Sequence, residues 1–325
     1  MLHEHRGQLL EGPKPLPAKW TDPALDPASD HAATSGILVR SPSCKLTSAR
    51  EEPLQPATKP TETDALTMAC IGIVAYILAN VVHEGLGHGG ACLITGGRPL
   101  LITAVNMNCS ADNRLVIAGG SLMNAAAAGL FFLVGRNARH TSPHLKYFAW
   151  LSMTVNLLDA AGYLAFSGIG GFGDWAMFIR GFNPQWAWRM GLSIAGIGAY
   201  VLCARRSLLE LRPLVGSSAK RYIVARRLCI PPYLAGGAVE CIAAAFNPQG
   251  WFLVVMSAAA PAFGGKSALV WGPEWLRGSS LPPGPDATPV PIRRNWVWIV
   301  AGIVIGVCFT IVLGPGVHFG EAGAR

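Results

Sequence analysis

The sequence predicts an all-α, polytopic integral membrane protein with about six or seven transmembrane helices behind a polar N-terminal tail. Only 14% of the 325 residues are charged and 51% are hydrophobic, whereas soluble globular proteins carry about 25% charged residues. Nine of the 18 acidic residues fall in residues 1–64, which leaves nine for the rest of the chain. From residue 65 onward, successive apolar runs dominate the sequence.

Residues 1–64 form the predicted disordered tail. They hold nine of the 24 prolines and mixed charges without apolar periodicity. Such a composition buries too little apolar surface to offset the entropy of the chain. The tail lacks the ordered basic region, apolar region and cleavage site of a signal peptide. Met68 opens the first apolar run and is an alternative start of translation, in which case residues 1–67 are not expressed.

Seven apolar runs follow the tail, and a membrane span needs about 20 apolar residues. The first run gains length if it continues into the motif that follows it, and the fourth run is marginal. Asp159 and Glu240 interrupt the third and fifth runs. The runs cover residues 65–82, 115–135, 147–166, 190–204, 228–246, 250–265 and 295–317.

The basic residues predict the orientation in the membrane, because cytoplasmic loops carry an excess of Lys and Arg. With seven spans and a cytoplasmic N-terminus, fourteen Lys and Arg residues, Lys266 among them, fall in cytoplasmic connections and five fall on the other side. We therefore expect a multi-pass protein with a cytoplasmic N-terminus, in the cell or inner membrane if the source is bacterial. The net charge of +8 is dispersed among apolar stretches, which excludes a nucleic-acid interface.

The eight cysteines show no C-x-x-C pair and no regular spacing. Neither a disulfide framework nor a zinc ribbon is supported by such a pattern. We expect most of them to be small apolar side chains that fill space between helices.

The hexapeptide H-E-G-L-G-H at residues 83–88 is the chemical centre of the sequence. Ionisable groups inside membrane segments are costly and mark functional sites. Two imidazoles and a carboxylate supply what zinc hydrolysis needs, namely two nitrogen ligands and a base for a water proton. We therefore predict His83 and His88 as ligands of Zn²⁺ and Glu84 as the catalytic base.

The spacing of the two histidines is one residue longer than in the standard H-E-x-x-H motif. Residues at i and i+5 lie about 140° apart around a regular α-helix, so His83 and His88 would not chelate one ion. A π-bulge widens one turn to i→i+5 and returns them to one face. Gly85 and Gly87 lie inside the segment that must deform and tolerate this best.

Residues 81–98, V-V-H-E-G-L-G-H-G-G-A-C-L-I-T-G-G-R, resemble the site-2 protease family of intramembrane zinc metalloproteases, with one extra residue between Glu84 and His88. The H-E-x-x-G-H spacing is also similar to the H-E-L-L-G-H motif of the dipeptidyl peptidase III family. The resemblance to the site-2 family implies a metalloprotease-like core at residues 65–190, followed by additional transmembrane helices at residues 191–325.

Two later segments extend this resemblance. Residues 100–114 correspond to a re-entrant, β-like hairpin that presents peptide substrate in the family. Residues 118–124, A-G-G-S-L-M-N, look like the family's A-G-P-x-x-N helix start without its proline, and close packing of small residues explains them equally well. The resemblance implies that Asn124 and Asn156 bind or orient the substrate or the site.

The resemblance implies an aspartate as the third zinc ligand, and two candidates are available. Asp174 follows the glycine-rich break at residues 167–173, where a ligand can be aimed freely, and we favour it. Asp159, which follows Asn156 in N-L-L-D, is the alternative ligand. In the other interpretations, Asp174 is a helix N-cap. Asp159 is then either a carboxylate that faces a hydrated gap between helices or an acid kept neutral by burial. Glu240 is a further acid that acts as a ligand, a proton relay or a packing partner.

The leading hypothesis is a zinc metallopeptidase that cleaves membrane protein or peptide substrates within or beside the lipid bilayer. One alternative is a transporter or receptor that uses the same His, Asp and Glu residues as an ion pathway. Transporters often contain internal repeats, and no convincing repeat relates the two halves of this chain. The other alternative is a pseudoprotease that has lost zinc.

Overall fold

Helices make up most of the chain, and they follow the apolar runs of the sequence. The computed structural model describes residues 63–111, 113–137, 142–217, 221–248, 250–277 and 288–319, so all of the predicted tail except Thr63 and Asp64 lies outside the described residues. The elements are α1 (Ala65–Val81), the π-helix η1 (Val82–Gly89), α2 (Gly90–Ile94), β1 (Pro99–Ile102), β2 (Met107–Cys109), α3 (Arg114–Asn137), α4 (Pro143–Gly170), α5 (Asp174–Phe178), α6 (Gln185–Val215), α7 (Arg221–Ala244), α8 (Trp251–Leu253), the π-helix η3 (Val254–Gly265), α9 (Ala268–Trp271), the 3₁₀-helix η4 (Gly272–Leu276), α10 (Trp296–Leu313) and β3 (Val317–His318).

Four helices are long and apolar enough to cross a membrane in the part of the chain that the structure describes. They are Ala65–Ile94, which joins α1, η1 and α2, then α3, α6 and α10. The first run therefore does continue into the histidine motif. The runs interrupted by Asp159 and Glu240 form the long helices α4 and α7, so six or seven spans stay a prediction. The segment boundary predicted at residue 190 falls inside α6.

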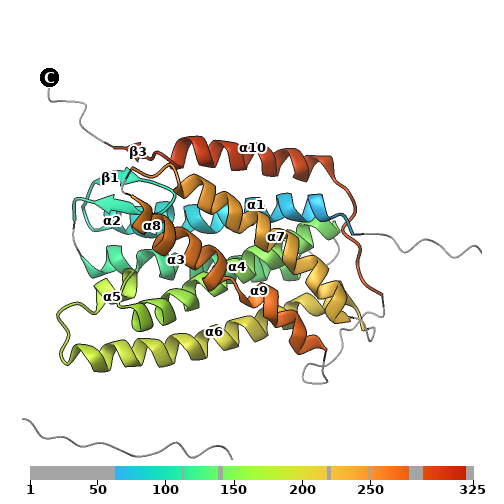
Figure 1. Cartoon of the computed structure of the whole chain (residues 1–325), viewed down its shortest axis with the longest axis horizontal. Coiled ribbons are helices and arrows are strands. Elements are labelled where there is room, and N and C mark those ends of the chain that lie inside the picture. Colours follow the sequence, from blue (N-terminus) through green and yellow to red (C-terminus); the bar gives the residue numbers. More distant parts are fainter. Residues whose placement is uncertain are drawn as a thin grey trace, which may run out of the picture. The chain divides into compact units, whose positions relative to one another are not determined.

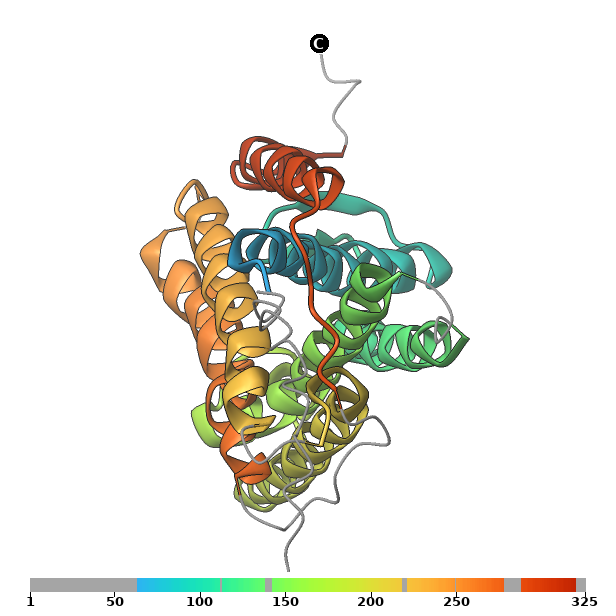
Figure 2. The ribbon, with the colours of Figure 1, turned by 90° about the vertical axis from the view of Figure 1, so that its right-hand side faces the viewer.

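The long helices pack side by side around one main core. α4 packs between α3 and α6, while α1 packs against α7 and α10 (Figures 1 and 2). Large apolar side chains that are fully buried join α1, α4, α6 and α7, among them Ile71, Leu151, Leu211 and Leu228. This core holds α1 in the middle of the bundle, and the histidine motif continues directly from its end.

Hydrogen-bonding side chains fix the starts of α1 and α10 next to each other. The Asp64 carboxylate accepts from the Thr67 backbone N–H and caps α1, and the Asn295 side chain caps α10. The Asn295 backbone N–H donates to Thr67 Oγ1 over 3.1 Å. Although burial opposes the shift, the hydrogen bonds from Thr67 and the nearby Arg294 guanidinium lower the pKa of the Asp64 carboxyl. This end of the bundle is therefore tied together by local polar contacts.

A small antiparallel sheet of order β2-β1-β3 lies at the opposite end (Figure 1). β1 and β2 form a hairpin within residues 100–114, where the sequence predicts a β-like segment. β3 comes from the end of the apolar run 295–317 and was not predicted.

A disulfide bond between Cys92 and Cys109 ties this hairpin to α2. The spacing of the cysteines supports no disulfide framework, and this single bond is a pairing that the sequence did not predict. Their 17-residue separation follows no known motif, and only the hairpin brings the two sulfurs together. Cys70 and Cys229 are buried and free, as expected for space-filling side chains.

Candidate functional site

The H-E-G-L-G-H motif forms a π-helix, as the spacing predicts. Residues Val82–Gly89 widen the helix between α1 and α2. The widened turn puts His83 and His88 on one face, with ring centroids 4.8 Å apart and nearly perpendicular planes. Both side chains are buried. The local backbone thus removes the geometric obstacle that an i, i+5 pair meets in a regular α-helix.

The start of α3 packs directly against this π-helix. A Cβ atom at Gly120 would lie 2.5 Å from His83 Nε2 and 2.6 Å from His88 Nε2. A side chain at position 120 would therefore occupy the space where the two imidazoles meet. The small residues of segment 118–124 allow close packing and leave room for the two rings at the same time.

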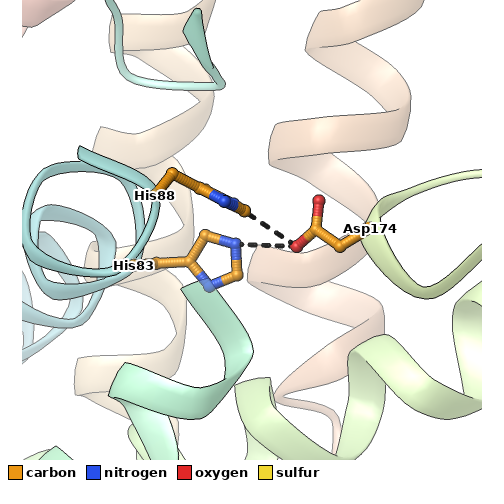
Figure 3. A group of neighbouring side chains, drawn as sticks. All are labelled: His83, His88 and Asp174. Atoms are coloured by element: carbon orange, nitrogen blue, oxygen red, sulfur yellow. Dashed lines mark hydrogen bonds and ion pairs between the residues drawn. The ribbon is translucent and has the colours of Figure 1, made fainter. Parts of the chain in front are cut away.

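Asp174 completes the group from the opposite side. It is the first residue of α5 and follows the interruption between α4 and α5, where Gly171 and Gly173 both have positive φ. Its Oδ2 lies 3.2 Å from His83 Nε2 and 3.5 Å from His88 Nε2 (Figure 3). One ligand atom from each of the three residues lies within 4.8 Å of the others. The structure therefore brings Asp174, not Asp159, to the two histidines.

The other ring nitrogens are held by hydrogen-bond acceptors. His83 Nδ1 lies 2.6 Å from Asn124 Oδ1, and His88 Nδ1 lies 2.7 Å from the Val116 carbonyl. Each Nδ1–H donates to its oxygen, which leaves the Nε2 lone pair free for a metal ion. Asn124 Nδ2 in turn donates to Asn156 Oδ1 over 2.8 Å. Both predicted asparagines thus orient His83.

Glu84 lies beside these donors and faces a cavity of about 810 Å³. Its side chain is buried, and its Oε2 has no hydrogen-bond partner among the described residues. His88, Asp174 and the hairpin residues 106–109 also line the cavity. Glu84 thus borders the cavity and has one carboxylate oxygen without a partner among the described residues, which suits it to hold or move a proton there. We call His83, Glu84, His88 and Asp174 the histidine cluster.

The donor set fits a zinc ion. Donor atoms about 2.0–2.2 Å from a tetrahedral ion are about 3.3–3.6 Å apart, and the two N to O distances to Asp174 are 3.2 and 3.5 Å. Two imidazole nitrogens and one carboxylate, with a fourth side toward the cavity, match the ligand number of catalytic zinc sites. Divalent ions with similar preferences fit the same set, so the geometry alone does not select zinc.

A second buried polar group, the lysine cluster, consists of Asp159, Glu240 and Lys266. Lys266 Nζ lies 2.8 Å from Asp159 Oδ1 and 3.6 Å from Glu240 Oε2. Lys266 lies in the turn between η3 and α9, but its side chain is only 3% exposed, so it does not face solvent as a loop residue would. The two acids inside apolar runs were the available signal, because buried charges need a partner. The Asp159 carboxylate therefore pairs with the Lys266 ammonium group.

Comparison of the chain with models of known protein families, with curated proteins and with solved structures found no match. The site is therefore defined by the chain's own residues. The resemblance of residues 81–124 to the site-2 protease family stays a prediction.

Proposed function

We propose that this protein is a membrane-embedded zinc metallopeptidase that hydrolyses peptide bonds of membrane proteins or peptides. The observation that carries the proposal is the convergence of His83, His88 and Asp174 beside Glu84, whose Oε2 has no hydrogen-bond partner among the described residues. A buried carboxylate is costly unless a cation or hydrogen-bond donors compensate it. A zinc ion would compensate both acids of the cluster and would explain why they are kept beside two oriented imidazoles.

Each residue of the cluster then has a defined task. His83, His88 and Asp174 would hold the ion, and the zinc would act as a Lewis acid toward the scissile carbonyl and toward water. Glu84 would accept a proton at its free Oε2 and return it to the leaving amine, as a general base and then a general acid. Asn124 and Asn156 would fix the His83 ring through the hydrogen bonds described above.

The membrane setting of the proposal rests on the apolar helices and on the distribution of charge. Four helices have the length and composition of membrane spans, and the predicted topology puts fewer Lys and Arg residues on the side of the hairpin. The Cys92–Cys109 disulfide lies at that end too, and disulfides persist in oxidising compartments. We therefore place the hairpin and the metal cavity on the non-cytoplasmic side and the N-terminus in the cytoplasm, with six or seven spans.

Metal content of the detergent-purified protein tests the proposal. We expect about one zinc per chain in the wild type, loss of zinc in His88→Ala and Asp174→Ala, and retention in the matched control Asp159→Ala. Size-exclusion profiles identify folded variants. Zinc-free, well-folded wild type would overturn the proposal and would favour the transport or pseudoprotease hypotheses. Zinc retained in Asp174→Ala and lost in Asp159→Ala would show that Asp159, and not Asp174, is the third ligand.

A further inference from the structure

A second cavity of about 330 Å³ lies beside the metal cavity. Its walls come from α4, α6 and η3 and are mostly apolar, with Leu158, Gly162, Ala165, Tyr200, Ala260 and Pro261 among the lining residues. We call it the apolar pocket. Its volume is at the lower end of the range for ligand pockets, about 300–1,000 Å³. An apolar pocket of this size selects its occupant by shape and by transfer of apolar surface from water.

The apolar pocket shares walls with the reaction centre. Tyr163 and Phe166 line both this pocket and the cavity that contains Glu84 and His88. The Tyr163 ring also stacks on the His83 ring, with centroids 4.7 Å apart. A peptide bound beside Glu84 would therefore lie next to Tyr163 and Phe166, the two rings between it and the apolar pocket. A side chain close to the scissile bond would enter the pocket by displacing one of these rings.

Three residues that line the apolar pocket also line a second space next to the metal site. Tyr163, Asp159 and Pro261 line the apolar pocket and also a small space bounded by His83 and Glu84. The Asp159 carboxylate is paired with Lys266, so it presents no free charge to the occupant. The pocket thus borders the metal site and is lined mostly by apolar groups, which suits an uncharged side chain.

We propose that the apolar pocket is the specificity pocket for a large aliphatic or aromatic side chain next to the scissile bond. This inference rests on the proposed peptidase function and names the substrate class of that site. A missing methylene in such a pocket lowers the specificity constant by about 10-fold to 200-fold. Peptides with Leu or Phe at the selected position are therefore cleaved at least tenfold faster than the Ala peptide.

Filling the pocket tests this inference. A Cβ atom at Gly162 would lie 3.7 Å from Gly265 Cα and from Tyr200 Cε2, which is ordinary contact, and the rest of a leucine side chain would fill the pocket. The probe is a series of zinc-dependent decapeptide cleavages with Ala, Val, Leu or Phe at one position. We expect Gly162→Leu to abolish the preference for Leu and Phe, so that the four peptides are cleaved at similar rates. Gly198→Leu is the matched control, because Gly198 on α6 has open space around it.

A second variant tests the inference independently if Gly162→Leu does not fold. Phe166→Ala removes the wall between the two cavities, and we expect it to raise the relative cleavage of the Phe peptide. The same series, measured as binding to Glu84→Gln by photo-crosslinking, gives a readout without turnover.

The outcomes separate the two proposals. Wild type that binds zinc but neither binds nor cleaves any peptide overturns the peptidase function together with this inference. Cleavage with side-chain preferences that neither variant changes overturns the specificity pocket alone. Lipid that co-purifies with wild type and is lost in Gly162→Leu, with unchanged peptide preferences, assigns the pocket to a lipid chain and also overturns the inference.

Discussion

The histidine cluster and the lysine cluster are two buried polar groups in one helical bundle, and they differ in how their charges are compensated. In the lysine cluster, an ammonium group lies 2.8 Å from one carboxylate and 3.6 Å from the other. In the histidine cluster, two carboxylates lie among imidazoles whose Nδ1 atoms are already engaged. The first cluster brings its own cation, and the second brings only ligand atoms.

This difference distinguishes a structural group from a functional one. A buried ion pair satisfies its charges internally and links the helices that carry it. A buried group that borders a cavity and keeps an oxygen without a partner is compensated only when something binds there. Hydropathy alone does not separate the two clusters, because His83 and Glu84 directly follow one apolar run and Asp159 and Glu240 interrupt two others. The clusters are separated by whether a lysine of the chain lies beside the carboxylates. Each prediction below tests that distinction.

Glu84→Gln is expected to have the largest effect. The substitution removes the proton acceptor but keeps the size of the side chain, so peptide cleavage falls by about 10²-fold to 10⁴-fold while zinc content is unchanged. The matched change in the lysine cluster, Asp159→Asn, leaves cleavage within about tenfold of wild type, because this side chain holds Lys266 and not the reacting groups. Cleavage rates of the peptide series, normalised to zinc, measure both. Equal losses in the two variants would contradict the distinction.

Lys266→Met is expected to lower the stability of the protein and not its catalysis. It leaves two buried carboxylates without a cation, which costs about 3–5 kcal/mol of unfolding free energy. The triple variant Asp159→Asn, Glu240→Gln, Lys266→Met removes all three charges and recovers most of that loss. Denaturant unfolding in detergent measures the free energies, and zinc per folded chain stays at the wild-type value. A lysine variant that unfolds normally but loses zinc would place Lys266 in the metal site.

The Cys92–Cys109 bond is expected to stabilise the hairpin that covers the histidine cluster. Cys109 lines the metal cavity, so the bond fixes one of its walls. Replacing both cysteines with serine costs about 3 kcal/mol for a loop of this length. The exposed, free Cys308 gives the control Cys308→Ser, with no measurable change. Thermal unfolding with and without a reducing agent checks both, and insensitivity of the wild type to reduction would show that the bond is absent.

The sequence predicted the helical elements and the centre of the site because these depend on local patterns. Each of the seven apolar runs overlaps a helical segment of the described residues, and the i, i+5 spacing of His83 and His88 predicts the π-helix that the structure contains. The glycine-rich break favoured Asp174 because a chain that leaves a helix can return a side chain to it.

Long-range pairings were not predictable in the same way. The disulfide depends on the return of the hairpin to α2, and β3 joins β1 from more than 200 residues away in sequence. Lys266 follows the apolar run 250–265 and has the pattern of a loop residue, and its burial depends on two acids that come from α4 and α7. A single sequence carries no signal for such contacts beyond the need of buried acids for a partner.

Asn124→Leu is expected to have the smallest effect, and it acts through His83 alone. Asn124 Oδ1 accepts from His83 Nδ1, and its Nδ2 donates to Asn156 and to the Ala79 carbonyl. Leucine fills a similar volume but releases the ring, so zinc affinity falls by about 10-fold to 100-fold, the range for such supporting contacts. Asn137→Leu on the exposed end of α3 is the matched control.

Competition with a zinc chelator measures the dissociation constants of both Asn variants. The lysine cluster offers the comparison that sharpens this result, because Glu240→Gln removes a partner of Lys266 and leaves the His83 ring in place. A loss of zinc affinity in Asn124→Leu and not in Glu240→Gln means that the metal site depends on the contacts that orient its imidazoles and not on the neighbouring charges. Equal losses would mean that the two clusters act as one electrostatic unit.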